Sequence, residues 1–489
     1  MTEQKKPPYG IIAILFTGAF VAIFTQTLLN IALPAIMADL NIEASTAQWL
    51  ITGYMLVNGI LIPASAYFIQ KYSNRSIFIL AMSLFVLGTL LAGLAPTFAV
   101  LLAARMIQAS GAALMMPLLM NVILVAFPVE RRGTAMGLFG LVMIVAPAIG
   151  PTLSGYVVEH YSWRVLFFIV LPLALIPLAL GIFKLKNLTP QNKELTLDKV
   201  SLVFSSLGFG GILYGFSTAG QNGWSDPVVL GTITVGVVSL VTFILRQLKL
   251  KEPLLEFRIY KYPMFALSSA ISIVISISMF SAMILMPIYV QTIKGISPVD
   301  SGLLMLPGAL VMGFMSPVTG KLFDKYGAKV LAIIGMTIVV ISTYFFSDLS
   351  INTTYLHIMF LYTIRMLGIS MVMMPVMTNG LNTLPIKAYP HGTAMNNTLQ
   401  QVSGAIGSAL LITIMNTRAT SVGKDLALGG ADPASIMKSS LMEGINYTFF
   451  ISTFIAAVAL LLTLFIKKPK RPVVEEEKNR GYKQEHIIE

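Results

Sequence analysis

Apolar segments of about 20 residues follow one another along nearly the whole of this 489-residue chain. Each is long enough to cross ~30 Å of hydrocarbon as an α-helix, which satisfies its backbone hydrogen bonds internally. A water-soluble domain would alternate apolar and polar faces, whereas 56% of these residues are apolar and only 11% are charged. We therefore predict an all-α polytopic membrane protein.

The apolar segments predict fourteen transmembrane helices. An even number of spans places both ends of the chain on one side of the membrane. Outside the spans we expect an external loop over residues 417–443 and a charged tail over residues 472–489. The predicted spans are 10–33, 46–69, 77–95, 98–127, 134–158, 165–183, 200–219, 228–248, 264–290, 301–322, 330–346, 355–384, 393–415 and 447–466.

The 33 Lys and Arg residues orient these helices. Of them, 26 lie in alternate short loops and the two tails, five lie in the other loops, and two lie inside apolar spans. Cytoplasmic loops carry such an excess of cations, so both termini are predicted in the cytoplasm. We expect a multi-pass protein of the cell (plasma) membrane, of bacterial origin. The net charge of +12 is dispersed over loops, which argues against nucleic acid as a partner.

Three short motifs recur in the same order. Their offsets are 260, 258 and 259 residues, which indicates that the first six spans repeat as the last six. We predict a six-helix bundle over 10–183, a linker with two inserted helices over 184–263 and a second bundle over 264–466, between cytoplasmic tails at 1–9 and 467–489. Such halves place a transport site near the bilayer midplane. The repeated motifs are Arg105-Met106 and Arg365-Met366, Met115-Met116-Pro117 and Met373-Met374-Pro375, and Gly133-Thr134-Ala135-Met136 and Gly392-Thr393-Ala394-Met395.

The loop after the tenth span carries a motif with a mechanical role. It reads Gly320-Lys-Leu-Phe-Asp324-Lys325-Tyr-Gly327-Ala-Lys329. Gly320 permits a close helix approach, Gly327 allows a tight turn, and Asp324 can face a helix N-terminus or a cation when the cytoplasmic side closes. An ordinary cationic loop is the alternative. The stretch resembles the G-x-L-x-D-[RK]-x-G-x-[RK] motif of the major facilitator superfamily, whose fold consists of two six-helix bundles.

The matching stretch of the first half departs from this motif. It has Gln70 at the acidic position, followed by Lys71, Ser73 and Arg75, and both glycines are missing. A neutral amide can form hydrogen bonds but cannot carry the charge of a carboxylate. We therefore expect the two gate loops to be unequal.

Span five contains a run of prolines and glycines, with Pro147, Gly150, Pro151 and Gly155. Proline interrupts the helical hydrogen-bond ladder and glycine lets a neighbouring helix pack closely, so this run predicts a kinked, tightly packed helix. A generic kinked span is the alternative. The run is similar to the signature of antiporters within the superfamily.

Further motifs extend the resemblance over roughly residues 10 to 466. The segment from Asn30 to Pro34, the Gln48-Trp49 and Trp163-Arg164 pairs and the fourteen spans resemble the drug:proton antiporter branch. This resemblance implies a secondary exporter of amphipathic small molecules (multidrug efflux) that is driven by proton antiport through alternating access. The alternative is the same fold moving a lipid, glycolipid or endogenous metabolite.

Enzymatic activity is not expected. The chain has no G-x-x-x-x-G-K-[ST] phosphate loop and no H-E-x-x-H motif. It has no Cys, and its four His residues do not pair at helical spacing, which argues against a metal site. We expect no cofactor beyond the proton gradient, a small-molecule substrate and the lipid bilayer as partners, and a monomer.

Arg105 lies inside span four. An arginine within hydrocarbon costs ~2.5–3.5 kcal/mol on insertion scales, so it must face a polar interior. The resemblance implicates it in proton coupling, while a structural role satisfied by backbone carbonyls is the alternative. Arg365 is its counterpart in the second half, where it is either structural or attracts an anionic group.

No Asp or Glu lies at the centre of a predicted span. Many members of the antiporter branch carry an Asp in span one where this chain has Thr25. A buried carboxylate is the simplest proton carrier and attracts cationic drugs, so both properties are in question here. The remaining candidates for proton binding are Asp39 and Glu159 at outer span ends, Asp324 at the gate and His357 near the start of span twelve.

Amide and methionine side chains are the main candidates for substrate contacts. They lie in spans one, two, four, twelve and thirteen, and methionine offers a flexible, polarisable surface. Amides also hold helices together, so a structural role is the alternative for each. The candidates, with one tyrosine and one arginine, are Asn30, Tyr54, Asn58, Met116, Asn121, Arg365, Met374, Asn379, Asn396, Asn397 and Gln400.

Overall fold

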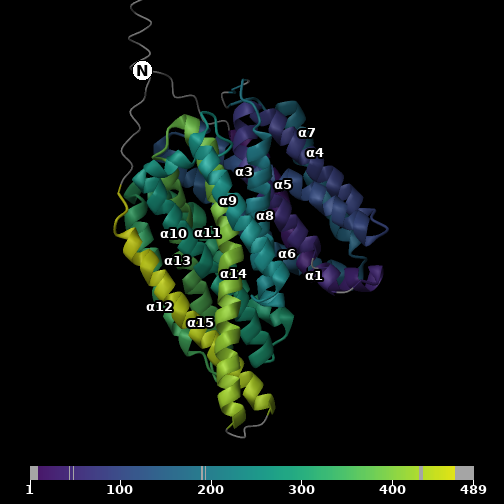
Figure 1. The fold of residues 1–489 in the computed structure, drawn as a ribbon, viewed down its shortest axis with the longest axis vertical. Helices are drawn as coiled ribbons and strands as arrows, with labels where there is room; N and C mark the ends of the chain where they lie inside the picture. The colour runs from purple at the N-terminus through teal and green to yellow at the C-terminus, as the bar shows by residue number, and fades with distance from the viewer. Residues whose placement is uncertain are drawn as a thin grey trace, which may run out of the picture.

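The computed structural model describes residues 9–42, 44–47, 49–188, 191–192, 194–428 and 433–467. These residues form long helices joined by short connections (Figure 1). Thirteen of the helices in this part are long and apolar enough to cross a membrane, and α6 is a fourteenth long helix. The prediction of an all-α polytopic protein is confirmed.

Each predicted span corresponds to one long helix. The first six are α1 (Tyr9–Leu40), α3 (Trp49–Lys71), α4 (Asn74–Gly93), α5 (Phe98–Ala126), α6 (Arg132–His160) and α7 (Arg164–Lys184). The next two are α8 (Lys199–Asn222) and α9 (Pro227–Lys249). The last six are α10 (Pro263–Ile288), α11 (Pro298–Tyr326), α12 (Ala328–Phe345), α13 (Tyr355–Leu381), α14 (Tyr389–Leu428) and α15 (Pro433–Thr463). Short elements between them are α2 (Ala44–Ala47), η1 (Val129–Arg131), η2 (Phe257–Lys261), η3 (Tyr289–Ile293), η4 (Phe346–Asp348) and η5 (Ile386–Ala388).

Polar residues set several helix starts. Ser73, Thr97 and Thr354 accept a hydrogen bond from a backbone N–H in the first turn of α4, α5 and α13. Such caps satisfy donors that have no partner within the helix. Gly327 ends α11 with φ of 80°, a conformation that favours glycine, and α12 starts at the next residue.

The first six and last six long helices pack by one pattern. In the first set α4 packs on α5 and α7, α3 on α5, and α1 on α6. In the second set α12 packs on α13 and α15, α11 on α13, and α10 on α14. The pairing of equivalent helices is what an internal repeat requires. The residue boundaries given above for the two bundles stay a prediction.

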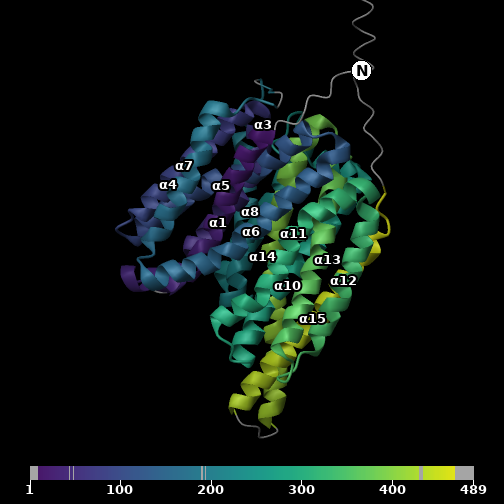
Figure 2. The ribbon, with the colours of Figure 1, turned by 180° about the vertical axis from the view of Figure 1, so that it is seen from behind.

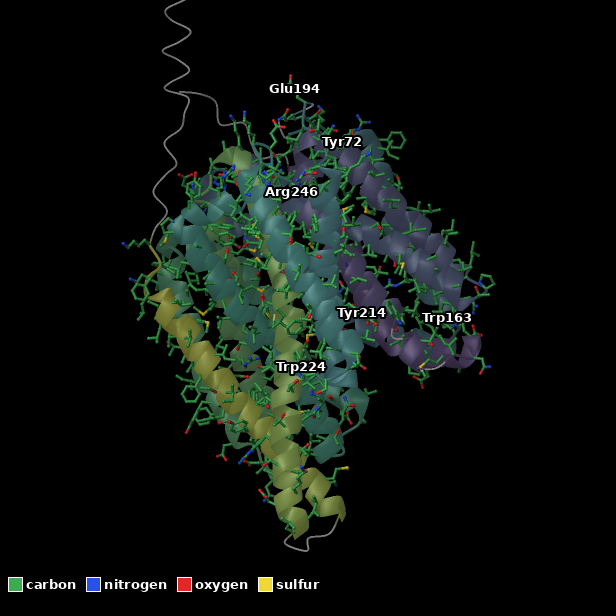
Figure 3. The ribbon with its side chains drawn as sticks, in the orientation of Figure 1. Tyr72, Trp163, Glu194, Tyr214, Trp224 and Arg246 are labelled. Atoms are coloured by element: carbon green, nitrogen blue, oxygen red, sulfur yellow. The ribbon has the colours of Figure 1, made fainter. Side chains whose placement is uncertain are left out.

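The two sets of helices meet mainly along α6 with α11 and α3 with α14, with further contacts of α14 with α5 and of α13 with α6. Figure 2 shows the two sets side by side from behind. We call the end at which α3, α7, α9 and α11 finish the basic end, because it carries Lys71, Lys184, Arg246 and Lys325. In Figure 3 Tyr72, Glu194 and Arg246 lie at this end, and Trp163 and Trp224 lie toward the other.

Apolar packing is continuous between the two sets at the basic end. The buried cluster of the first six helices includes Leu381, Leu384, Tyr389 and Met395 from the end of α13 and the start of α14. A second buried cluster belongs to the last six helices. The closest association of the two sets is therefore at the basic end.

The inserted helices α8 and α9 pack on each other and lie across the junction of the two sets. α8 contacts both α3 and α14. The ring of Tyr214 stacks on Trp49 with centroids 5.6 Å apart, and Trp224 donates a hydrogen bond to the Thr413 hydroxyl at 2.6 Å. The inserted pair thus touches one helix of each set.

The expectation of a loop over residues 417–443 is wrong. α14 continues to Leu428 and α15 starts at Pro433. The two extensions are joined by an ion pair of 3.0 Å between Arg418 and Glu443, and the Arg418 guanidinium lies 5.3 Å from the ring centre of Tyr447. The two extensions therefore pack on each other as helices, a contact between segments that hydropathy does not report.

Candidate functional site

Asp324 joins the two sets of helices at the basic end. One carboxylate oxygen accepts the backbone N–H of Gly133 at 2.8 Å. The other accepts the backbone N–H of Thr134 at 2.9 Å and its hydroxyl at 2.7 Å. The carboxylate of α11 therefore caps the N-terminus of α6, where the helix dipole favours a negative charge.

Small residues let α6 and α11 cross closely beneath this cap. A Cβ on Gly133 would lie 2.6 Å from the Gly320 carbonyl oxygen, and one on Gly137 would lie 2.5 Å from the Ser316 carbonyl oxygen. Neither position leaves room for a side chain. Farther from the basic end the spacing relaxes, because the nearest atoms to a Cβ on Gly313 are α6 side chains at 3.5–3.6 Å.

Gln70 occupies the equivalent position of the first half and makes a different contact. Its amide nitrogen lies 3.0 Å from Nε2 of His391, near the start of α14. Nδ1 of His391 accepts the backbone N–H of Glu256 at 3.2 Å. The two gate contacts are therefore unequal in this structure: one has a carboxylate on backbone amides and the other an amide on an imidazole.

The two cations of the first-half gate motif bind the surrounding backbone, whereas Lys325 of the second half does not bind backbone atoms of the described residues. Lys71 donates to the Leu195 carbonyl at 2.6 Å, and Arg75 to the Ile182 carbonyl at 2.7 Å. Lys325 is exposed, with its ammonium 5.0 Å from the ring centre of Tyr326.

Arg132 makes a further bridge that the sequence analysis did not name. Its guanidinium, buried at the start of α6, donates to the Asn382 side-chain oxygen and to the Tyr389 hydroxyl, both at 2.9 Å. The repeat offset of 259 residues pairs Arg132 with His391, so each half places a basic side chain at this position. That correspondence is the signal that could have identified both residues.

Arg105 is buried in the first set of helices. Its guanidinium donates to the side-chain oxygen of Gln108. The amide nitrogen of Gln108 in turn donates to the Thr89 hydroxyl at 2.7 Å. It also lies 4.3 Å from the ring centre of Tyr54 on α3, a cation–π geometry. No Asp or Glu forms an ion pair with it among the described residues.

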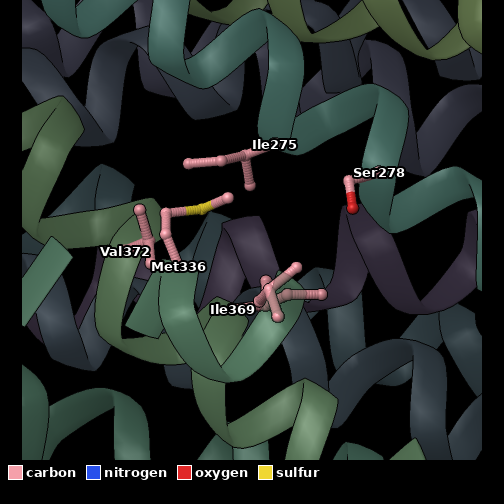
Figure 4. A pocket seen from close by; sticks show the side chains of 6 residues that line it. Ile275, Ser278, Met336, Ile369 and Val372 are labelled. Atoms are coloured by element: carbon pink, nitrogen blue, oxygen red, sulfur yellow. The ribbon is translucent and has the colours of Figure 1, made fainter. Parts of the chain in front are cut away.

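Arg365 is equally buried in the second set. It donates to the Thr343 hydroxyl at 3.0 Å and to the hydroxyls of Ser278 and Ser281, each at 3.1 Å. A void beside Ser278 is too small for a water molecule, so it is not a substrate cavity (Figure 4). The void is lined by Ile275, Ser278, Met336, Val339, Ile369 and Val372.

The outer candidates for proton binding do not face the interior. Asp39, beyond the spanning part of α1, accepts Arg164 at 2.6 Å and the Trp163 indole at 3.1 Å. Hydrogen bonding from Arg164, then Trp163, holds the pKa of Asp39 below its ordinary value. Glu159 and His357 are exposed at helix ends. Thr25, where the antiporter branch often has an Asp, donates to the Val21 carbonyl of its own helix.

Several substrate candidates lie where the two sets meet. Asn397 on α14 contacts the Met120 sulfur on α5 at 3.1 Å. Met374 on α13 faces Gly140 on α6, because a Cβ there would lie 3.1 Å from its Cγ. Tyr54, Asn58, Asn121 and Asn396 are buried, whereas Met116 and Gln400 are partly exposed. The Asn30 side chain lies outside the described residues.

Asn379 lies near the end of α13, where its amide donates to the Lys467 carbonyl, 3.3 Å away, and its contact with a substrate stays a prediction. One expectation requires correction. Gly155 makes no close packing contact, because a Cβ there would meet no atom within 4 Å. Gly150 does pack closely, against Thr27 on α1. Pro147 and Pro151 lie outside the described side chains.

Comparison with known proteins identifies the family. Residues 15–408 match the model of the Major Facilitator Superfamily. The chain is 47% identical to the "Uncharacterized MFS-type transporter YcnB" of Bacillus subtilis, covering 97% of this chain and 99% of that one. It is 45% identical to the "Lincomycin resistance protein LmrB" of the same species, covering 96% and 98%. The fold matches the human organic anion transporter MFSD10 with a TM-score of 0.62 at 11% identity, over 92% and 100% of the two chains. The chain therefore belongs to the Major Facilitator Superfamily and is a multi-pass membrane transporter.

Proposed function

We propose that this transporter exports amphipathic small molecules in exchange for protons. In this proposal fourteen spans place the basic end and both termini in the cytoplasm of a bacterial cell, and one chain is sufficient for transport. The cargo enters between the two bundles when the basic end opens and leaves when the opposite end opens, as in alternating access. The relatives named as lincomycin resistance proteins, 43–45% identical over nearly the whole chain, support export of an antibiotic.

The Asp324 contact is the observation that supports a gate at the basic end. A single carboxylate of α11 binds the first residues of α6 through three hydrogen bonds. These bonds break if α6 and α11 separate, and they re-form without new covalent chemistry. A contact of this kind stabilises one of two arrangements, which is what a transporter gate requires.

Buried charge supports a neutral or anionic cargo. The buried charged side chains of the described residues are Arg105, Arg132 and Arg365, and no Asp or Glu is buried with them. Among the described residues a cationic drug would find no fully buried carboxylate to oppose its charge, whereas a cargo with hydroxyl, carbonyl or anionic groups could meet the buried amides and arginines. This observation also suits an endogenous anionic lipid or metabolite.

The test is transport by the purified protein in proteoliposomes. Uptake of radiolabelled lincomycin would be measured with the pH gradient imposed in each direction and with none. We expect uptake when the compartment that the lincomycin enters is the more acidic one, and none with the gradient collapsed. Rates that ignore the sign of the gradient would refute proton antiport. A panel of cationic, neutral and anionic dyes would then test cargo class, and indifference to lincomycin and to every dye would favour an endogenous cargo.

A further inference from the structure

His391 is an imidazole enclosed where three elements meet at the basic end. This residue is only 7% exposed. Nδ1 faces the backbone N–H of Glu256, just before η2, and Nε2 faces the Gln70 amide at the end of α3. Both groups that contact the ring nitrogens are uncharged.

These contacts fit a neutral ring. A backbone N–H can only donate, so Nδ1 must keep its lone pair to accept from Glu256, and the ring proton then lies on Nε2. The Gln70 amide can turn so that its oxygen accepts from Nε2–H, which exchanges the amide's bond to the Ala66 carbonyl for one to the ring. An imidazolium carries a proton on both nitrogens, so Nδ1–H would point at the Glu256 N–H.

The charged groups around the ring are bound elsewhere. The Glu256 carboxylate accepts from the backbone and guanidinium of Arg258 at 3.0 and 3.3 Å. Lys71, next to Gln70, donates to the Leu195 carbonyl, and Lys387 in η5 is exposed. Apolar side chains of Phe265 in α10, of Leu381 at the end of α13 and of Leu384 in the turn that follows border the adjacent Gly392. On the α6 side Arg132 donates to the Tyr389 hydroxyl, and Tyr260 in η2 packs its ring on Phe265.

We propose that His391 is a proton-binding site of the basic-end gate, neutral while the two bundles meet there and protonated when they part. The proton comes from water at the opened end and binds Nδ1 after the Glu256 contact is lost. The inference rests on the alternating access proposed above and names a group that makes one gate respond to pH. Asp324 holds the other gate contact through a carboxylate, so the two gate contacts differ in their response to pH.

The size of the effect follows from the linkage of proton binding to opening. A solvent-exposed imidazole titrates near pH 6.5. If only the open gate binds the proton, the ratio of open to closed gate is multiplied by 1 + 10^(6.5 − pH), which is about 1.1 at pH 7.5 and about 11 at pH 5.5. The ratio of open to closed gates should therefore rise about tenfold when the pH falls from 7.5 to 5.5.

The experiment measures the distance across the basic end. Tyr72 after α3 and Tyr326 at the end of α11 are equivalent positions of the two halves, 45% and 50% exposed. Because the chain has no Cys, Tyr72→Cys and Tyr326→Cys create the only two sites for spin labels. Pulsed electron-electron spin resonance in lipid nanodiscs at pH 7.5 and 5.5 would give the populations of the short and long distances.

Two variants assign the response. In His391→Gln the amide can accept from Glu256 and contact Gln70 without titrating, so the tenfold rise should disappear. In the triple variant His160→Gln, His357→Gln, His486→Gln it should remain, because His391 is then the sole histidine. A tenfold rise that persists in His391→Gln, or one that vanishes in the triple variant, would overturn the proposal. If the gate of His391→Gln is open at both pH values, the triple variant decides whether His391 causes the rise: a tenfold rise there supports the proposal and its absence overturns it.

The result is separable from the proposed antiport. Lincomycin transport that ignores the pH gradient, together with a pH-dependent distance that needs His391, would refute proton antiport and leave His391 as a pH-responsive gate residue. Gradient-driven transport together with an unchanged distance in the wild type would refute the role of His391 and leave antiport in place.

Discussion

Replacing Asp324 by Asn tests the gate contact most directly. The carboxylate uses both oxygens, one for the N–H of Gly133 and the other for the N–H and hydroxyl of Thr134. An asparagine has one oxygen and one NH₂ group. Whichever way its amide turns, one backbone N–H at the start of α6 faces a donor instead of an acceptor. The variant also removes the negative charge from the positive end of the helix dipole.

The magnitude follows from these losses. A backbone N–H left without an acceptor costs ~1–3 kcal/mol, and the lost charge at a helix N-terminus costs ~0.3–1 kcal/mol. We take about 2 kcal/mol for the closed gate, which is about a 30-fold rise in the ratio of open to closed molecules. The two labelled positions at 72 and 326 report this ratio directly, at a fixed pH of 7.5.

Asp226 provides a matched control. It caps the N-terminus of α9, but a single oxygen accepts the N–H groups of Val228 and Val229 at 2.7 and 3.2 Å. Asparagine can keep both bonds, and the cap does not join the two bundles, so Asp226→Asn should leave the distance populations unchanged. A ratio in Asp324→Asn within about twofold of wild type would refute the reasoning, since about 0.4 kcal/mol is less than the ~1 kcal/mol minimum cost of an unpaired backbone N–H.

Three further outcomes are expected from the geometry. Gly137→Ala, which puts a methyl group 2.5 Å from a backbone oxygen of α11, should favour the open gate in the same distance measurement, whereas Gly155→Ala, with no atom within 4 Å, should not. Arg105→Ala should lower lincomycin efflux at least about tenfold with normal membrane insertion, because a desolvated cation–π contact is worth ~2 kcal/mol, while Tyr54→Phe keeps the ring and should retain efflux. Normal efflux by Arg105→Ala would remove this residue from the mechanism. Because the pKa of Asp39 lies below its ordinary value, the stability that its carboxylate adds to the folded protein is complete above about pH 4 and is lost only as pH falls further. Asp39→Asn should therefore leave the shape of the transport pH profile unchanged between pH 5 and 8.

The sequence located the helices because each apolar run must satisfy its backbone inside the membrane. The prediction from sequence failed beyond the apolar runs, where that constraint does not apply. Residues 417–443 contain charged and small residues, and there α14 and α15 extend as helices that contact each other, for example through Arg418 and Glu443. Hydropathy along one segment cannot report a contact with another segment.

The gate was only partly predictable. The Asp324 motif predicted either a helix N-terminus or a cation as the partner of the carboxylate, and the loss of the acidic group at Gln70 predicted unequal contacts. His391 was passed over because one histidine between two predicted spans has no local pattern, and its partner Gln70 lies 321 residues away in the chain. Asn379 was assigned to the cavity from its residue type, and the sequence did not show that the segment after α15 brings the Lys467 carbonyl to it.

The gate carboxylate of α11 binds peptide groups and one hydroxyl, not a basic side chain. A charge exchange between partners, the usual genetic test of an ion pair, therefore has no partner residue to exchange at positions 133 and 134. Second-site suppressors of Asp324 variants should arise instead at residues that alter the balance between the two arrangements of the bundles, for example along the α3–α14 junction. The same geometry leaves no room for a side chain at position 133.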